Sequence, residues 1–279
     1  MKSIQKTVIL LLLLALPASC SVPGFVKVSK FDQSNTILAP HITLVNWNAH
    51  KGWDSQFTKD LMTLINRNKP DIIFLQEAHV DLLQNEEMAG YFANGWKFPW
   101  PGGAIIGVVT LSRSAPVRVR PVPGKYREFF VTSPKVSLVT EYLLPGGERL
   151  LAVNIHLLNF ERWGTMRFRS QLDDLKSIMA DHAGPIILAG DFNTWNRKRL
   201  GVVQKLAEDL RLKEVTDFPP GRKTGDMEFS AFNWLFGIDK DLPLDRVYYR
   251  GFKIHHPRLL PYESSDHRPL LVELIRDTN

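Results

Sequence analysis

IILAGDFNTWN, residues 186–196, is the segment around which the chain is organised. A short apolar run ends in a glycine, and Asp191 and Asn193 follow at once. The run is too short for a helix and begins directly after a Gly-Pro pair, so it predicts a buried strand. The alternation of a strand turns Phe192 into the core and points Asp191 and Asn193 the same way. The alternative for this segment alone is a strand followed by an Asx-turn.

The two polar residues indicate a ligand site. They would stand at the C-terminal end of the strand, where open α/β sheets bind their ligands. A carboxylate beside an amide oxygen suits a hard cation and the phosphate bound to it. A site is favoured over a simple turn because the chain ends several other strands in the same way.

The N-terminus predicts export. Lys2 and Lys6 precede an unbroken apolar run over 8–16, and small residues then lead to Cys20. This run is shorter than the about 20 residues of a membrane-spanning helix, so residues 1–20 are predicted to be a signal peptide. Removing the two lysines lowers the formal charge from +6 to +4, a mild surplus for the mature chain. Because Cys20 is the only cysteine, a disulfide within the chain is excluded.

The end of the signal resembles a bacterial lipobox, in which the cysteine is lipidated after cleavage. Ala18 and Ser19 fit that pattern, whereas Pro17 departs from it. Two products are therefore expected as alternatives. One is a lipoprotein tethered to a membrane through Cys20, and the other is a soluble periplasmic or secreted protein.

One domain is predicted after the signal. Residues 21–40 are rich in turn formers and read as a linker or arm, and the domain is predicted over 41–276. A Pro-Gly-Gly sequence at 145–147 predicts a hairpin. Strands are predicted over 42–45, 71–76, 104–111, 136–144, 149–155, 186–191, 244–249 and 270–275. Helices are predicted over 54–69, 165–182 and 197–212.

Polar side chains stand at the ends of six of these segments, and each has an ordinary explanation by itself. Glu77 could be a solvated charge and His156 a packed or surface histidine. Asp245 could form a surface ion pair with Arg246, and residues 266–267 could be a turn that caps the last strand. One shared site explains all six positions, whereas the ordinary explanations require six independent coincidences. The positions are Asn48, Glu77, His156, Asp191 with Asn193, Asp245, and Asp266 with His267.

In this order the motifs resemble those of the endonuclease/exonuclease/phosphatase superfamily. The superfamily includes pancreatic DNase-like nucleases, apurinic endonucleases, neutral sphingomyelinases and inositol-polyphosphate 5-phosphatases. The resemblance spans residues 41–276 and implies a four-layer α/β sandwich, in which two packed mixed β-sheets are flanked by helices. The motifs are Asn48, Gln76-Glu77, Asn154-Ile155-His156, Gly190-Asp191-Phe192-Asn193, Asp245 and Ser265-Asp266-His267.

The resemblance also implies a metal and a base. Glu77 is expected to be the main carboxylate ligand of Mg²⁺, or of Mn²⁺ in its place, with Asn48 beside it and Asp266 as a second contact. Mg²⁺ keeps several of its waters, so few protein ligands suffice. His267 is expected to be the general base that activates water, as a neutral imidazole held in its tautomer by Asp245.

The remaining site residues are expected to act on the phosphate. Asp191 and Asn193 would position the nucleophile and the phosphate oxygens. His156 would bind phosphate or act as an acid on the leaving-group side. A histidine at this position, together with Thr194-Trp195 after the central motif, departs from apurinic endonucleases and disfavours a repair nuclease.

These patterns predict an Mg²⁺-dependent phosphoesterase of the cell envelope, acting as a monomer with no obligate protein partner. The substrate stays open among a lipid headgroup, a nucleic acid and a small phosphodiester. The alternatives are a secreted or periplasmic nuclease and a non-catalytic binding protein on the same fold.

Two groups of residues near the motif loops bear on the substrate. The tryptophans either stack on a substrate or pack in the core, and the basic residues either contact a polyanion or form a solvated face. The tryptophans are Trp47, Trp53, Trp163, Trp195 and Trp234. The basic residues are Arg162, Arg167, Arg169, Arg197, Lys198 and Arg199.

Overall fold

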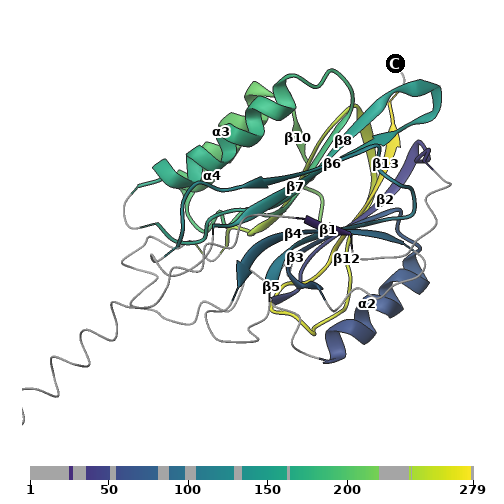
Figure 1. Cartoon of the computed structure of the whole chain (residues 1–279), viewed down its shortest axis with the longest axis horizontal. Helices are drawn as coiled ribbons and strands as arrows, with labels where there is room; N and C mark the ends of the chain where they lie inside the picture. The colour runs from purple at the N-terminus through teal and green to yellow at the C-terminus, as the bar shows by residue number, and fades with distance from the viewer. Residues whose placement is uncertain are drawn as a thin grey trace, which may run out of the picture.

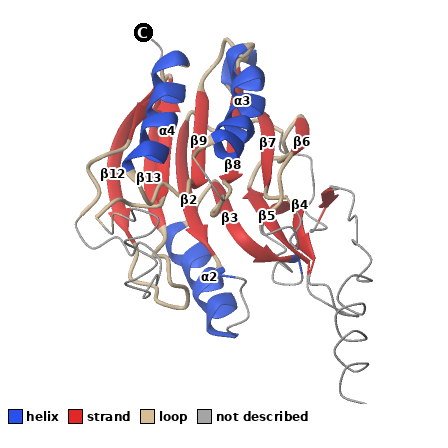
Figure 2. Ribbon diagram, turned by 90° about the vertical axis from the view of Figure 1, so that its left-hand side faces the viewer, coloured by secondary structure: helices blue, strands red, loops and turns tan. Residues whose placement is uncertain are grey.

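Two β-sheets pack face to face, with helices on both outer faces (Figures 1 and 2). The computed structural model describes residues 25–27, 36–50, 55–80, 88–97, 105–128, 134–161, 164–219, 239 and 241–277. The predicted signal over 1–20, including Cys20, lies outside these ranges. None of the helices within them is both long and apolar enough to cross a membrane.

The first sheet has seven strands in the order β1-β4-β5-β3-β2-β13-β12. Its centre is the predicted strand–helix–strand unit, because β2 and β3 pair in parallel and the helix α2 (Ser55–Asn68) connects them. The other neighbours in this sheet pair antiparallel. The strands are β1 (Phe25–Lys27), β2 (His41–Asn48), β3 (Ile72–His79), β4 (Ala89–Lys97), β5 (Ile105–Ser112), β12 (Phe252–Leu259) and β13 (Leu270–Arg276).

The second sheet has six strands in the order β10-β11-β9-β8-β7-β6. Its one parallel pair is β8 with β9, which α3 (Met166–Ala180) connects, and α4 (Arg197–Asp209) follows β9. The predicted hairpin joins β7 to β8 through the short turn Pro145–Gly147, where both glycines have φ +84°. The strands are β6 (Arg118–Pro123), β7 (Val136–Leu143), β8 (Arg149–His156), β9 (Ile186–Asp191), β10 (Lys213–Glu214) and β11 (Asp245–Arg250).

The central strands are buried on both sides, which explains their nearly continuous apolar sequence. In β9, Ile187 and Ala189 face the other sheet, and Ile186 and Leu188 face the helices. The core between the sheets is completed from β2 and β3 by residues such as Leu44. Buried strands therefore form a rigid frame whose ends are held in fixed positions.

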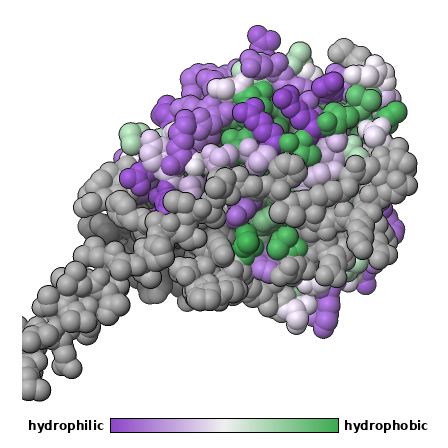
Figure 3. All heavy atoms as spheres, in the orientation of Figure 1, coloured by the Kyte–Doolittle hydropathy of each residue, from purple (hydrophilic) through white to green (hydrophobic). Residues whose placement is uncertain are grey.

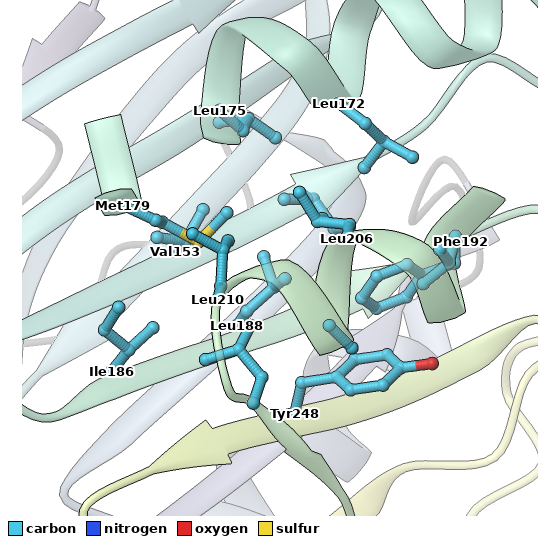
Figure 4. Packing of buried hydrophobic residues seen from close by; sticks show 14 of the residues in the cluster. Val153, Leu172, Leu175, Met179, Ile186, Leu188, Phe192, Leu206, Leu210 and Tyr248 are labelled. Atoms are coloured by element: carbon cyan, nitrogen blue, oxygen red, sulfur yellow. The ribbon is translucent and has the colours of Figure 1, made fainter. Parts of the chain in front are cut away.

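Each helix covers its sheet with the predicted apolar face. In α2 the buried residues are Phe57, Leu61, Leu64 and Ile65, and in α3 they include Phe168, Leu172, Leu175 and Met179. Figure 4 shows side chains of α3 and α4 meeting those of β8, β9 and β11. Figure 3 shows a largely hydrophilic surface in the region of α3.

Several strands were not expected from the sequence. The strand β1 lies within the predicted arm over 21–40, and β6, β10 and β12 form the other sheet edges. Edge strands tolerate proline and charge, and β6 contains both as RVRPVP, which hides the alternation. The strand β4 ends at Lys97, although the aromatic segment over 95–103 reads as a turn-rich loop.

Candidate active site

The predicted site residues come from both sheets and meet at one end of the sandwich. His156 ends β8 and lies opposite Asp191, which ends the parallel neighbour β9. The next strand, β11, runs antiparallel, so its first residue, Asp245, lies opposite Asp191 from the other side. Asn48 ends β2 in the first sheet, and His267 lies in the loop that leads into β13. The two sheets each supply part of one cluster.

Asp245 and His267 form the buried pair that the sequence predicts. Nδ1 of His267 lies 2.5 Å from Oδ2 of Asp245, and both side chains are almost fully buried. Nδ2 of Asn46 donates to the other oxygen of Asp245 at 3.4 Å. The backbone N–H of His267 donates to Ser265 Oγ, and its carbonyl accepts from the indole of Trp47 at 2.9 Å. Because Nδ1 faces Asp245, proton exchange with a ligand falls to Nε2 of His267.

The environment raises the pKa values of two site residues, His267 and Asp191. Burial opposes the charged form of His267, but Asp245, with smaller contributions from Asp191 and Asp266, raises the pKa of His267 to about 10. Burial, reinforced by the charge of Asp245, raises the pKa of Asp191 to about 6. The carboxylate of Asp245 thus favours the imidazolium form of His267, whereas the sequence predicts that His267 acts as a neutral imidazole.

Asp191 is the centre of the cluster. Nδ2 of Asn48 donates to its Oδ2 at 2.9 Å, which joins the two sheets. Nε2 of His156 lies 3.7 Å from the same oxygen. Its other oxygen accepts from the backbone N–H of Asn193 at 2.9 Å. The Asx-turn and the site are thus the same structure, since the turn holds the carboxylate in place.

Phe192 and Asn193 adopt the predicted orientations in part. Phe192 is fully buried under α4, as the alternation predicts. Asn193 has φ +49°, and its Nδ2 donates to the carbonyl of Leu157 at 2.8 Å. The side chain therefore joins the loop after β9 to the loop after β8.

Glu77 lies inside β3, at an irregularity of the pairing with β5 that falls between Leu75 and Ala78. Its φ is +47°, a conformation that is uncommon for residues other than glycine, asparagine and aspartate. Such strain is typical of functional sites. The carboxylate lies 3.6 Å from Nε2 of His156 and 3.8 Å from Nζ of Lys135.

Lys135 is a site residue that the sequence analysis missed. Its Nζ lies 3.0 Å from Nε2 of His156. Burial, together with the charge of Lys135 and then of His267, lowers the pKa of His156 well below its usual value. Counting outward from the hairpin turn pairs Leu138 with Asn154, so the register alone could have placed residue 135 close to His156.

Asp266 faces the cluster from the loop before β13. Its Oδ1 lies 3.4 Å from Nδ1 of His50 and 3.3 Å from Ser265 Oγ. Ser265 Oγ also donates to the carbonyl of Asn48 at 2.7 Å, and Asn48 Oδ1 accepts from the backbone N–H of His50 at 2.9 Å. These bonds fasten the ends of β2 and the loop to each other.

A chain of buried amides runs beneath the site from one sheet to the other. Nε2 of Gln76 donates to Asn46 at 2.9 Å and to Asn154 at 2.8 Å. Asn154 in turn donates to the carbonyls of Leu75 and Val109. Because Asn46 also contacts Asp245, the amides connect the interior of both sheets to the Asp245–His267 pair.

The donor set fits a hard divalent cation that keeps most of its waters. Glu77, Asp191, Asp245 and Asp266 supply carboxylates, and the nearby cationic groups are Lys135 and His267, which leaves an excess of negative charge. Across the described ranges, no three His, Cys, Asp or Glu side chains are grouped to hold a metal ion by themselves. Mg²⁺ is commonly bound by one or two carboxylates with water and substrate phosphate, so the residues present suit it.

The structure shows which of the tryptophans and basic residues near the motif loops are buried and which are exposed. Trp47 and Trp195 are buried and pack in the core, so they do not offer faces to a substrate. Arg197 is exposed and lies 3.6 Å from Asp239. Arg199 is 1% exposed, so it does not contact a polyanion, contrary to one alternative. Trp53, Trp163, Trp234 and Arg162 lie outside the described residues.

Comparisons with known proteins find matches to the sequence of this chain. The model of the Endonuclease/Exonuclease/phosphatase family matches residues 45–267. A UPF0294 protein of Vibrio campbellii is 32% identical over 233 residues, covering 83% of this chain and 76% of that protein.

Solved structures show the same fold. An endonuclease/exonuclease/phosphatase from Beutenbergia cavernae has a TM-score of 0.61 at 18% identity and covers 85% of this chain and 72% of its own. The human Nocturnin catalytic domain, solved with a bound sulfate anion, has a TM-score of 0.59 at 18% identity and covers 90% and 97%. The four-layer sandwich of two mixed sheets is therefore the architecture of this chain.

Proposed function

The chain belongs to the endonuclease/exonuclease/phosphatase family, whose members are typically hydrolases of phosphate esters, and we propose that it is an Mg²⁺-dependent phosphoesterase. One observation carries the proposal. The Asp245–His267 pair, Asp191 and His156 meet at the end of both sheets, with Glu77 at 3.6 Å from His156. This combination of carboxylates, imidazoles and a single lysine suits a phosphoryl group and a hard cation.

Glu77 would hold the cation, with Asn48 and Asp266 close to it. When bound, the cation supplies a positive charge that polarises a phosphoryl oxygen and makes a coordinated water more acidic. The bulge in β3 supports this role, because it presents the Glu77 carboxylate beside His156 and Lys135.

Asp191 is the better proton acceptor at neutral pH. Its pKa of about 6 leaves the carboxylate ionised and close to the ambient pH, as general-base catalysis requires. His267, with a pKa of about 10, would then carry a positive charge and donate from Nε2 to a phosphoryl oxygen. Asp245 stabilises that charge and fixes the ring. The sequence predicts the other assignment, with His267 as the neutral base, and the pH dependence of activity distinguishes the two.

His156 and Lys135 would bind the phosphoryl group on the side opposite His267. The lowered pKa of His156 keeps its ring neutral, so it is a hydrogen-bonding group and a poor acid. Lys135 supplies the positive charge, 3.0 Å from the ring. The side chain of Lys135 is 19% exposed, and its ion pair with Glu77 is long, at 3.8 Å, so the ammonium group can also reach a ligand.

A substrate panel tests the proposal. Hydrolysis of a chromogenic phosphodiester, a phosphomonoester, phospholipids, plasmid DNA and RNA is measured with Mg²⁺ or Mn²⁺, with Asp191→Asn as the control. Hydrolysis that EDTA and Asp191→Asn both abolish is the expected result. Cleavage of DNA or RNA alone would favour the nuclease, and binding without hydrolysis of any member would favour the non-catalytic alternative.

We further propose that the protein acts in the cell envelope. The basic residues and apolar run of the signal support this, and so do the small residues before Cys20. Mass spectrometry of the protein from native membranes is expected to find a lipidated N-terminal Cys20. A mature protein that begins with an unmodified residue would instead indicate a soluble exported product.

A further inference from the structure

Arg199 is a buried cation in the first turn of α4. Its side chain is 1% exposed, and its guanidinium lies over the rings of Phe168 and Trp195 at 4.5 and 4.6 Å. The N-cap residue Asn196 accepts from the backbone N–H of Arg199 at 2.9 Å, which fixes where the side chain leaves the helix. The arginine is therefore held both by its backbone and by two aromatic faces.

The guanidinium bonds to both loops that carry site residues. Nη1 of Arg199 donates to the carbonyl of Leu158 at 2.7 Å and to the carbonyl of Asn193 at 2.9 Å. Leu158 follows His156 by two residues, and Asn193 follows Asp191 by two residues. One nitrogen atom of a rigid, planar group thus sets the separation of the two loops.

Two other bonds join the same loops closer to the site. The backbone N–H of Leu157 donates to the carbonyl of Asp191 at 2.9 Å, and Asn193 Nδ2 donates to the carbonyl of Leu157 at 2.8 Å. Gln171 from α3 holds the first loop from behind, through the carbonyl of His156 and the N–H of Leu158. Arg199 is the group that extends this ladder of bonds to α4.

A purely structural role does not require a charge at this position. Burying a cation is costly, and well-packed apolar residues often stabilise a protein as well or better. The carboxylate of Glu161 lies 3.9 Å from Nη2, and its side chain is 3% exposed, so a buried acid offsets the charge of the guanidinium. What an apolar residue could not do is donate to two carbonyls in a fixed geometry.

We propose that Arg199 is a positioning residue that keeps His156 and Asp191 at their working separation. The expected fall in kcat rests on the proposed phosphoesterase function, whereas the effect of Arg199 on the spacing of the two loops does not. Nε2 of His156 and Oδ2 of Asp191 are 3.7 Å apart. Loss of the two hydrogen bonds from Nη1 of Arg199 would let the two loops move apart and change this distance. Displacements of about 1 Å can cost roughly 100-fold in rate.

The test compares Arg199→Lys and Arg199→Met with the matched control Arg197→Met, two residues earlier on the same helix. The side chain of Arg197 is 85% exposed. For each folded variant, kcat, KM and the affinity for Mn²⁺ are measured. Amide hydrogen exchange is measured in peptides that cover residues 155–159 and 190–194, because Leu157 N–H bonds between the loops.

Both Arg199 variants are expected to lower kcat by roughly 10–100-fold while KM and Mn²⁺ affinity change little. Exchange should accelerate in the two loop peptides and stay unchanged in β2 and α2, and Arg197→Met should match the wild type. Wild-type kcat and loop protection in a folded Arg199→Met protein would overturn the proposal. Exchange that accelerates uniformly over the domain would also overturn it, by showing general destabilisation.

The exchange data also separate this proposal from the proposed function. If the wild type hydrolyses no substrate and the loop peptides still exchange faster in both Arg199 variants, the positioning role stands and the phosphoesterase fails. If hydrolysis is found and Arg199→Lys changes neither kcat nor loop exchange, the positioning role fails and the phosphoesterase stands.

Discussion

Replacing Gly190 with alanine is expected to force apart the two strands that hold His156 and Asp191. Gly190 lies opposite Ile155 in the parallel pair of β9 with β8, one residue before the site. A Cβ atom at this position would lie 2.0 Å from the carbonyl oxygen of Ile155 and 2.8 Å from its carbon. Its φ of +151° is also a conformation that residues with side chains rarely adopt.

The size of the effect follows from this geometry. Real Cβ contacts essentially never fall under 3.0 Å, so the strands must separate by at least about 1 Å at the pair next to the site. Overpacking costs about 1–3 kcal/mol, and backbone strain adds about 1–3 kcal/mol. A total of about 2–6 kcal/mol corresponds to a fall in Tm of roughly 4–24 °C for a domain of this size.

Gly201→Ala on α4 is the matched control. No atom lies within 4 Å of the Cβ that alanine would add there, and the glycine is helical, so this change should raise the free energy of unfolding by about 0.5–1 kcal/mol. Tm is measured by circular dichroism, and kcat is measured with the active substrate. A Gly190→Ala protein whose Tm lies within a degree or so of the wild type would refute the argument.

Four other predictions concern the site. Asp245→Asn and His267→Ala should each lower kcat by roughly 10²–10³-fold, because each removes the charged donor to the phosphoryl oxygen. The double variant should lose little more because the pair acts as one unit, and losses that multiply would refute the pairing. Glu77→Ala should weaken Mn²⁺ binding in isothermal titration without lowering Tm, and an unchanged affinity would remove Glu77 from the metal site. Activity should rise with pH about a midpoint near 6, set by the pKa of Asp191, whereas a midpoint near 10 would return the base to His267. The last prediction concerns stability. Because the pKa of His267 is raised, the pair stabilises the fold fully below pH 6.5, and this contribution is lost as the pH rises through about 10. The fall in Tm between neutral pH and about pH 10 should therefore be smaller in Asp245→Asn than in the wild type.

The frame of the molecule was predictable because it depends on periodicity along the chain. The apolar run ending in Asp191 is a buried strand, and the apolar faces of 54–69 and 165–182 are buried in helices as expected. The pairing of Asp245 with His267 was also predicted, although β11 and β13 belong to different sheets and the contact is made between the sheets. The edge strands were missed because they bury less and carry charge or proline.

The chemistry of single side chains was less predictable because it depends on contacts between distant segments. Arg199 reads as one of a basic group in the sequence, yet it is buried against carbonyls that include one 41 residues away. Lys135 has no motif around it, and its place beside His156 comes from the hairpin register. The raised pKa of His267 depends mainly on Asp245 and Asp191, which only the fold brings close to it.

The amides that run beneath the site have a consequence for how activity arises during folding. Asn46 and Gln76 come from one sheet and Asn154 from the other, and Asn46 reaches Asp245. Neither sheet alone holds both His267 and its partner carboxylate, so a half-folded chain has no assembled dyad. Refolding followed by hydrolysis and by intrinsic tryptophan fluorescence should therefore show activity returning in the last kinetic phase. The protein would have no catalytic activity until its two sheets have packed against each other.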